Sequence, residues 1–167
     1  VAIVETMGRD NGWLALEGGS VGGADIILIP EVKVELDDFC KKVAEVLKNQ
    51  EHVTVSVSEG VDYPEFSGMY EGETDANGNE KKGGIRDFLK NELIKRFPEM
   101  VGRIKTEEVG YRTRSTTPST DDILLSEKLG GEAARLAFEG HWGTSITSQN
   151  VPKGRFFIRL YIRMSTV

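Results

Sequence analysis

The chain has 167 residues, of which 38% are hydrophobic and 29% charged, and its net charge is −6. This length and composition exclude a disulfide-stapled peptide and a disordered polyelectrolyte. The acidic balance argues against nucleic acid as a partner, because binding a duplex requires a basic face. No apolar run approaches the ~20 residues of a membrane span, so we expect no membrane partner.

The start of the chain and its single cysteine bear on where the protein is found. The chain begins at Val1 with a strand pattern, without an initiator Met or a signal sequence, so we expect a fragment of a longer protein. Cys40 lies in a helical pattern with no His or Cys at ligand spacing. We therefore expect a buried thiol and a cytoplasmic location.

Short apolar runs rich in β-branched residues alternate along the chain with amphipathic stretches. This alternation predicts an α/β fold, a three-layer sandwich with a mainly parallel sheet. The predicted strands are residues 1–5, 25–29, 53–58, a weaker run at 101–109, and 144–147. Apolar residues spaced by three and four predict two helices that cover the sheet, one at 36–46 and one at 88–97.

The rest of the chain carries weaker patterns. Residues 62–84 are rich in glycine and poor in aliphatic residues, which predicts a surface loop or hairpin. Thr117 or Ser119, followed by an acidic pair, predicts the start of a helix that ends near residue 140 and is weakened by two glycines at 130–131. Residues 154–167 alternate apolar and polar side chains and predict a final strand; we assign no role to 151–167.

Three positions after predicted strands carry polar chemistry. Gly8 and Arg9 follow the first strand and open a helix, which favours phosphate binding, although an ordinary turn with a solvated Arg explains the same pattern. Arg112 and Arg114 form a second basic cluster, with a polar loop as the alternative. Glu59 ends the third strand, where a surface carboxylate is the simpler interpretation.

Other common catalytic patterns do not occur. His52 precedes a strand and His141 lies beside a tryptophan, so neither histidine suggests a catalytic triad or a metal site. No Ser or Thr has a base at a fixed spacing. The sequence contains neither a Walker loop nor a G-x-G-x-x-G segment.

Several separated blocks, in order and with their spacing kept, resemble the phosphofructokinase family over residues 1–150. The blocks are Met7-Gly8-Arg9 with Gly12-Trp13-Leu14-Ala15, Gly22-Gly23-Ala24-Asp25 with Pro30-Glu31, Ser58-Glu59-Gly60, and Gly110-Tyr111 with Arg114, Pro118 and Asp122-Ile123-Leu124. The resemblance implies a module that binds fructose 6-phosphate, within a 6-phosphofructokinase of glycolysis that transfers a phosphoryl group to the 1-hydroxyl.

The resemblance also implies site residues. Those expected to bind the substrate are Met7, Gly8, Arg9, Glu59, Tyr111 and Arg114, and Arg9 is also expected to be catalytic. The family takes a basic residue from a neighbouring subunit, for which Arg103 or Lys105 is the nearest candidate, so a homo-oligomer is expected. Mg²⁺ would be bound mainly by the donor phosphates and by the missing half of the enzyme, with no metal ligand in this chain.

The chain departs from the family at informative places. Ser115 and Thr116 stand where the family usually has two glycines, and the family's donor-binding Gly-Gly-Asp loop and its Thr-Ile-Asp segment with the catalytic base do not occur. Both are expected upstream of Val1, so the isolated chain should be inactive. Trp13 and Tyr111 resemble the pyrophosphate-dependent branch slightly more than the ATP-dependent one. The alternative function is a non-catalytic sugar-phosphate sensor or allosteric half.

Overall fold

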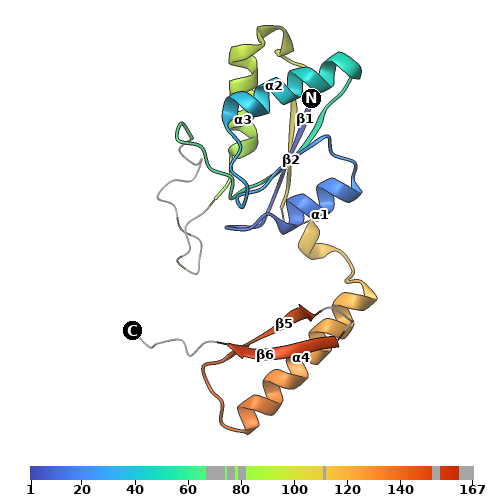
Figure 1. Ribbon diagram of the computed structural model, residues 1–167, viewed down its shortest axis with the longest axis vertical. Helices are drawn as coiled ribbons and strands as arrows, with labels where there is room; N and C mark the ends of the chain where they lie inside the picture. Colours follow the sequence, from blue (N-terminus) through green and yellow to red (C-terminus); the bar gives the residue numbers. More distant parts are fainter. Residues whose placement is uncertain (67–73, 75–77, 79–81, 111, 152–154, 162–167) are drawn as a thin grey trace. The chain divides into compact units, whose positions relative to one another are not determined.

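The computed structural model describes residues 1–66, 74, 78, 82–110, 112–151 and 155–161. The chain divides into two compact units, Val1–Ser115 and Thr116–Val167 (Figure 1).

The first unit is built on a parallel sheet of four strands in the order β2-β3-β1-β4. The strands are β1 (Ala2–Thr6), β2 (Ile26–Leu28), β3 (Thr54–Ser58) and β4 (Lys105–Val109). Thr6 at the end of β1 pairs with Ser58 of β3 on one side and with Val109 of β4 on the other. The carboxyl ends of these three strands therefore lie at the same edge of the sheet, which is where ligands bind in open α/β sheets.

Helices cover both faces of this sheet, as the sequence predicts: α1 (Trp13–Val21), α2 (Leu36–Asn49) and α3 (Ile85–Arg96). The Ser56 hydroxyl donates to the Ala15 carbonyl of α1 at 2.9 Å. The neighbours of Ser56 in β3, which point to the other face, are fully buried in one apolar cluster with Phe39 of α2 and Leu89 of α3. The three-layer α/β prediction is confirmed, and so is the burial of Cys40 in this core.

A buried carboxylate ties strand β1 to helix α3. Glu5, 3% exposed, accepts the backbone N–H of Gly84 with Oε1 and that of Arg86 with Oε2, both at 3.1 Å. The Arg86 guanidinium lies 3.5 Å from Glu5 and 2.8 Å from Glu108. Burial raises the pKa of the Glu5 carboxyl, and the hydrogen bonds from Arg86 and Gly84 oppose that rise. Both oxygens of Glu5 are occupied in holding the start of α3.

The second unit contains helix α4 (Thr120–Phe138) and the antiparallel strands β5 (Ser145–Val151) and β6 (Arg155–Tyr161). Ser119 begins α4 with a capping box, in which its hydroxyl accepts from the Asp122 N–H and the Asp122 carboxylate accepts from the Ser119 N–H, both at 3.2 Å. The predicted helix start is confirmed at Ser119, and β6 confirms the final strand over residues 155–161, whereas residues 154 and 162–167 lie outside the described part of the chain. The two glycines of α4 do not interrupt it.

Four expectations need correction or concern residues outside the described part of the chain. The predicted strand at 144–147 becomes β5, but it pairs only with β6 and does not belong to the parallel sheet. The weaker run at 101–109 forms a strand only from Lys105, because Gly102, at φ +79°, is part of a turn. Most of the predicted loop at 62–84 lies outside the described residues, as does Tyr111. No helix in the described part of the chain is long and apolar enough to cross a membrane.

Candidate functional site

The segment after β1 and the segment after β3 meet at the carboxyl edge of the sheet. Glu59 Oε1 accepts two backbone hydrogen bonds, from the N–H of Gly8 at 3.0 Å and from the N–H of Arg9 at 2.8 Å. The Glu59 N–H in turn donates to the Thr6 carbonyl at 2.9 Å. The structure thus brings Gly8, Arg9 and Glu59 into one cluster, although about fifty positions separate Glu59 from the other two in the sequence.

Arg9 has an unusual backbone conformation. Its φ is +52°, and it is the one residue other than glycine with a positive φ among those that the structure describes. A non-glycine residue in this region carries a cost of about 1–3 kcal/mol, which is typical of functional sites. A Cβ placed on Gly60 would lie 1.8 Å from the Arg9 carbonyl oxygen. The Arg9 backbone is therefore held between the Glu59 carboxylate and a position that only glycine can occupy.

The turn that carries Arg9 is closed by contacts that the sequence did not indicate. The Asn11 N–H donates to the Gly8 carbonyl at 3.1 Å, and the Ser58 hydroxyl donates to the Asn11 carbonyl at 3.0 Å. A Cβ on Gly8 would lie 2.3 Å from the Asn11 carbonyl oxygen. The sequence suggested that Gly8 leaves room for a ligand; the structure shows that the turn itself requires glycine. Glu31, after β2, accepts the Gly12 N–H at 2.9 Å and anchors the end of this turn.

The charged groups near Arg9 pair with one another and not with its guanidinium, within the described residues. Asp10, the next residue, forms an ion pair with Lys82. The hydrogen bond from Lys82 lowers the pKa of the Asp10 carboxyl, and the charge of Arg9 adds a smaller effect in the same direction. The Arg9 guanidinium itself has no hydrogen bond or salt bridge within the described residues, and the side chain is exposed. A positive group is therefore presented at the carboxyl edge of the sheet, where it could meet an anion.

Of the other predicted site residues, some lie at the same sheet edge as Arg9 and some at the opposite edge. Met7 follows β1 directly in the sequence and is partly buried. Arg114 is exposed in a short 3-10 helix, Thr113–Ser115, which follows the carboxyl end of β4 at the same sheet edge. Tyr111 lies outside the described residues. Arg103 and Lys105 lie at the amino end of β4, at the opposite edge, so neither joins the Arg9 cluster in the same chain.

No metal-binding group is found in the described part of the chain: none of its His, Cys, Asp and Glu side chains form a group of three or more that could hold an ion. Both histidines are exposed, His52 just before β3 and His141 in the connection after α4. Among the described residues, the Arg9 cluster offers one guanidinium, one carboxylate and the backbone around them.

The family model described as "Phosphofructokinase" matches residues 1–137. The chain belongs to the phosphofructokinase family. It is 38% identical over 148 residues to the pyrophosphate--fructose 6-phosphate 1-phosphotransferase of Dictyoglomus thermophilum, covering 86% of this chain and 41% of that protein. It is 34% identical over 149 residues to the ATP-dependent 6-phosphofructokinase of Corynebacterium efficiens, covering 87% of this chain and 42% of that protein. The chain thus spans less than half the length of either phosphofructokinase.

Solved structures show the same fold. The pyrophosphate-dependent phosphofructokinase from Marinobacter aquaeolei superposes with a TM-score of 0.63 at 22% identity, covering 95% of this chain and 38% of that one. The Pichia pastoris phosphofructokinase in the T-state superposes with a TM-score of 0.61 at 24% identity, covering 95% of this chain and 16% of that one. At this identity the likeness establishes the phosphofructokinase fold and nothing further.

Proposed function

We propose that this chain is the sugar-phosphate-binding half of a 6-phosphofructokinase, which transfers a phosphoryl group from pyrophosphate or ATP to the 1-hydroxyl of fructose 6-phosphate. The observation that carries the proposal is the Glu59 carboxylate, which accepts the Gly8 and Arg9 N–H groups and so joins two separate family motifs into one cluster. Residues 1–150 form this module in the proposal, with Met7, Tyr111 and Arg114 as further substrate contacts.

Each group has a role that its chemistry suits. The exposed Arg9 guanidinium meets phosphate oxygens and stabilises the charge that develops during transfer, and Arg114 binds the phosphate of the acceptor. Glu59 uses Oε1 for the turn, so Oε2, which has no partner within the described residues, accepts a hydrogen bond from a sugar hydroxyl. The clamped backbone keeps these groups in place before the substrate arrives, which lowers the entropy cost of positioning it.

The remaining parts of the reaction come from outside this chain. The 1-hydroxyl oxygen bonds to the terminal phosphorus of the donor as the bond to the leaving phosphate breaks, and the hydroxyl proton passes to a base in the other half. Mg²⁺ supplies charge neutralisation at the donor phosphates. The described residues contain no group that fits a metal, so we assign no step of this chain to it. We also propose that the full-length protein is a homo-oligomer in the cytoplasm. The isolated chain would be inactive.

Steady-state kinetics of the full-length protein test this proposal with fructose 6-phosphate, Mg²⁺ and either donor. Arg114→Ala should raise KM for fructose 6-phosphate by about tenfold or more, because a charge-assisted contact contributes about 1.5–3 kcal/mol. Lys41→Ala, which removes an exposed α2 lysine paired with Asp38, is the control and should leave KM unchanged. A full-length protein that binds fructose 6-phosphate without turnover with either donor would support the sensor alternative instead. An unchanged KM in Arg114→Ala, as in Lys41→Ala, would remove Arg114 from the site.

A further inference from the structure

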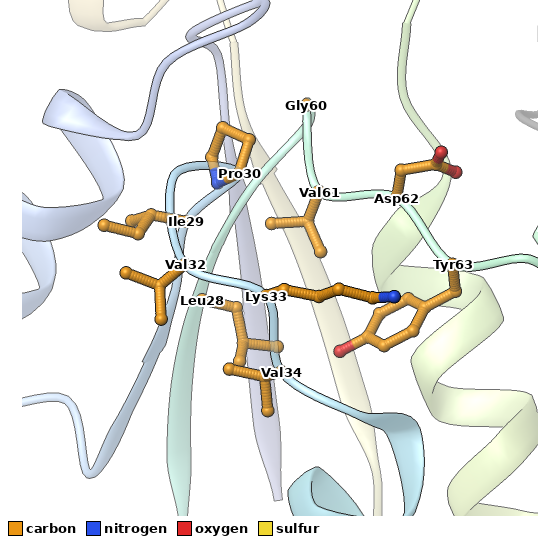
Figure 2. A pocket seen from close by; sticks show the side chains of 10 residues that line it. All are labelled: Leu28, Ile29, Pro30, Val32, Lys33, Val34, Gly60, Val61, Asp62 and Tyr63. Atoms are coloured by element: carbon orange, nitrogen blue, oxygen red, sulfur yellow. The ribbon is translucent and has the colours of Figure 1, made fainter.

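A pocket of about 270 Å³ lies beside the proposed site, between two connections at the carboxyl edge of the sheet. One wall is residues 28–34, which lead from β2 to α2, and the other is residues 60–63, which follow Glu59 (Figure 2). Leu28, Val34 and Val61 supply aliphatic surface to it. The proposed function does not use these side chains.

The polar group of this pocket is the Tyr63 hydroxyl. Tyr63 is 4% exposed, and its ring packs against Phe88 with ring centres 5.8 Å apart. The hydroxyl is buried and has no hydrogen-bond partner among the described residues. In Figure 2 it points toward Leu28 and Val34, two of the residues that line the pocket. Burial raises the pKa of Tyr63 to about 12, so the group is a neutral O–H that can donate a hydrogen bond.

An unpaired buried hydroxyl is uncommon in proteins, because such a group loses its hydrogen bonds to water on folding. A single trapped water is a poor remedy here, since a buried water needs two to four polar partners and the pocket wall around the hydroxyl is aliphatic. A ligand that brings its own acceptor and an apolar body satisfies both the hydroxyl and the wall.

Lys33 adds a charge to this arrangement. Its side chain extends across the pocket in front of the Tyr63 ring in Figure 2, and it is mostly exposed, with Nζ 3.6 Å from the Glu35 carboxylate. An exposed ion pair of this length is weak and easily exchanged for another anion. Asp62 points away from the pocket interior. The pocket therefore offers a neutral donor inside and an ammonium at its mouth, both of which suit an anion.

We propose that this pocket binds a small carboxylate with a compact apolar body, one carboxylate oxygen accepting from the Tyr63 hydroxyl, the Lys33 ammonium meeting the charge, and the body contacting Leu28, Val34 and Val61. The site is separate from Arg9 and Glu59 and does not depend on the proposed function. Its wall does continue directly from Glu59 through Gly60, so an occupant would contact the segment that holds the Arg9 turn.

Calorimetric titration of the full-length protein tests the site with phenylacetate and 4-methylpentanoate as probes, and with phenylacetamide as the uncharged control of the same shape. We expect the carboxylates to bind with a Kd of about 1 mM and the amide to bind at least about fivefold more weakly. Saturating fructose 6-phosphate should not displace either carboxylate. Displacement would place the probes in the sugar-phosphate site and overturn the proposal.

Three variants sharpen the titration. Tyr63→Phe keeps the ring and removes the hydroxyl, and it should weaken phenylacetate binding by about fivefold or more without lowering the melting temperature. Lys33→Gln should weaken it by a similar factor, whereas Lys42→Gln, an exposed α2 lysine paired with Glu45, should not. Unchanged affinity in Tyr63→Phe, or no carboxylate binding up to about 10 mM in the wild type, would overturn the proposal.

Discussion

Two carboxylates of the first unit, Glu5 and Glu59, both fix a distant backbone segment, but they differ in how many of their oxygens this takes. Each accepts two backbone N–H groups from a segment distant in the sequence. Glu5 uses both oxygens, is buried, and is further paired with Arg86. Glu59 uses one oxygen for both N–H groups, is only partly buried, and keeps its second oxygen for another donor. A carboxylate with both oxygens hydrogen-bonded only stabilises the fold. A carboxylate at a sheet edge with one oxygen unused can also accept a hydrogen bond from a ligand.

The largest expected effect is the difference between Glu5→Gln and Glu59→Gln. At position 5 the Gly84 and Arg86 N–H groups are accepted by different oxygens, so an amide would turn its NH2 group toward one of them, and it also leaves Arg86 without a buried partner charge. We expect a loss of about 3–5 kcal/mol in the free energy of unfolding. At position 59 the amide oxygen can still accept both N–H groups, so the loss should stay below about 1 kcal/mol.

Thermal and urea unfolding of the full-length protein measure this difference, and the KM for fructose 6-phosphate provides the second readout. Glu59→Gln should raise KM while leaving stability nearly intact. Equal losses in the free energy of unfolding for the two variants would show that Glu59 stabilises the fold as much as Glu5 does, which would contradict the separate binding role of Glu59.

The second prediction concerns the space behind the Arg9 turn. Gly60→Ala puts a methyl group against the Arg9 carbonyl, and because its carbon would lie 1.8 Å from that oxygen, the backbone must move to relieve the overlap. We expect a loss of about 1–3 kcal/mol in stability and a larger loss in affinity for the sugar phosphate. Gly18→Ala is the matched control, because a Cβ there meets nothing within 4 Å and its helix gains about 0.5–1 kcal/mol. Normal affinity in Gly60→Ala would show that the turn need not be held as it is.

The sequence predicts the fold of this chain better than the contacts of its site. Strand and helix patterns place all four strands of the parallel sheet and helices α2, α3 and α4, because burial on one or both faces imposes a period on the side chains. The same reasoning puts Gly8, Arg9 and Glu59 at one sheet edge, since they follow parallel strands. The antiparallel partner of β5 is not predictable in this way, because its local pattern does not say which strand it will pair with.

The close contacts of the site have no local signature. The shared oxygen of Glu59, the hydrogen bond from Ser58 to Asn11 and the fit of Gly60 against Arg9 all join residues about fifty positions apart. Their spacing follows from the register of β1 and β3, which brings Thr6 opposite Ser58, and the register is a property of the folded sheet. The pocket at Tyr63 was likewise missed, because a tyrosine in a loop gives no sign that its hydroxyl will be buried.

The third prediction separates the backbone of Arg9 from its side chain. Arg9→Gly removes the cost of the positive φ, so stability should rise by up to about 1 kcal/mol, while loss of the guanidinium should lower affinity for fructose 6-phosphate by about tenfold or more. Arg9→Ala should lose the same affinity without the gain in stability. Melting temperatures and substrate titrations of the two variants check this. A fall in stability for Arg9→Gly would mean that the side chain itself supports the turn.

The smallest expected effect is on the alkaline titration of Tyr63, whose buried hydroxyl has no hydrogen-bond partner among the described residues. Burial raises its pKa to about 12 from an ordinary value near 10, so the folded state holds this proton more tightly than the unfolded chain does. Its contribution to stability is therefore fully present below about pH 10 and is lost as the pH rises toward about 12. Tyrosinate absorbance of the full-length protein should include one group that ionises last in this window and disappears in Tyr63→Phe. If the difference between the two titration curves instead develops near pH 10, the ordinary range of tyrosine, the hydroxyl reaches solvent and is not a buried donor waiting for a ligand.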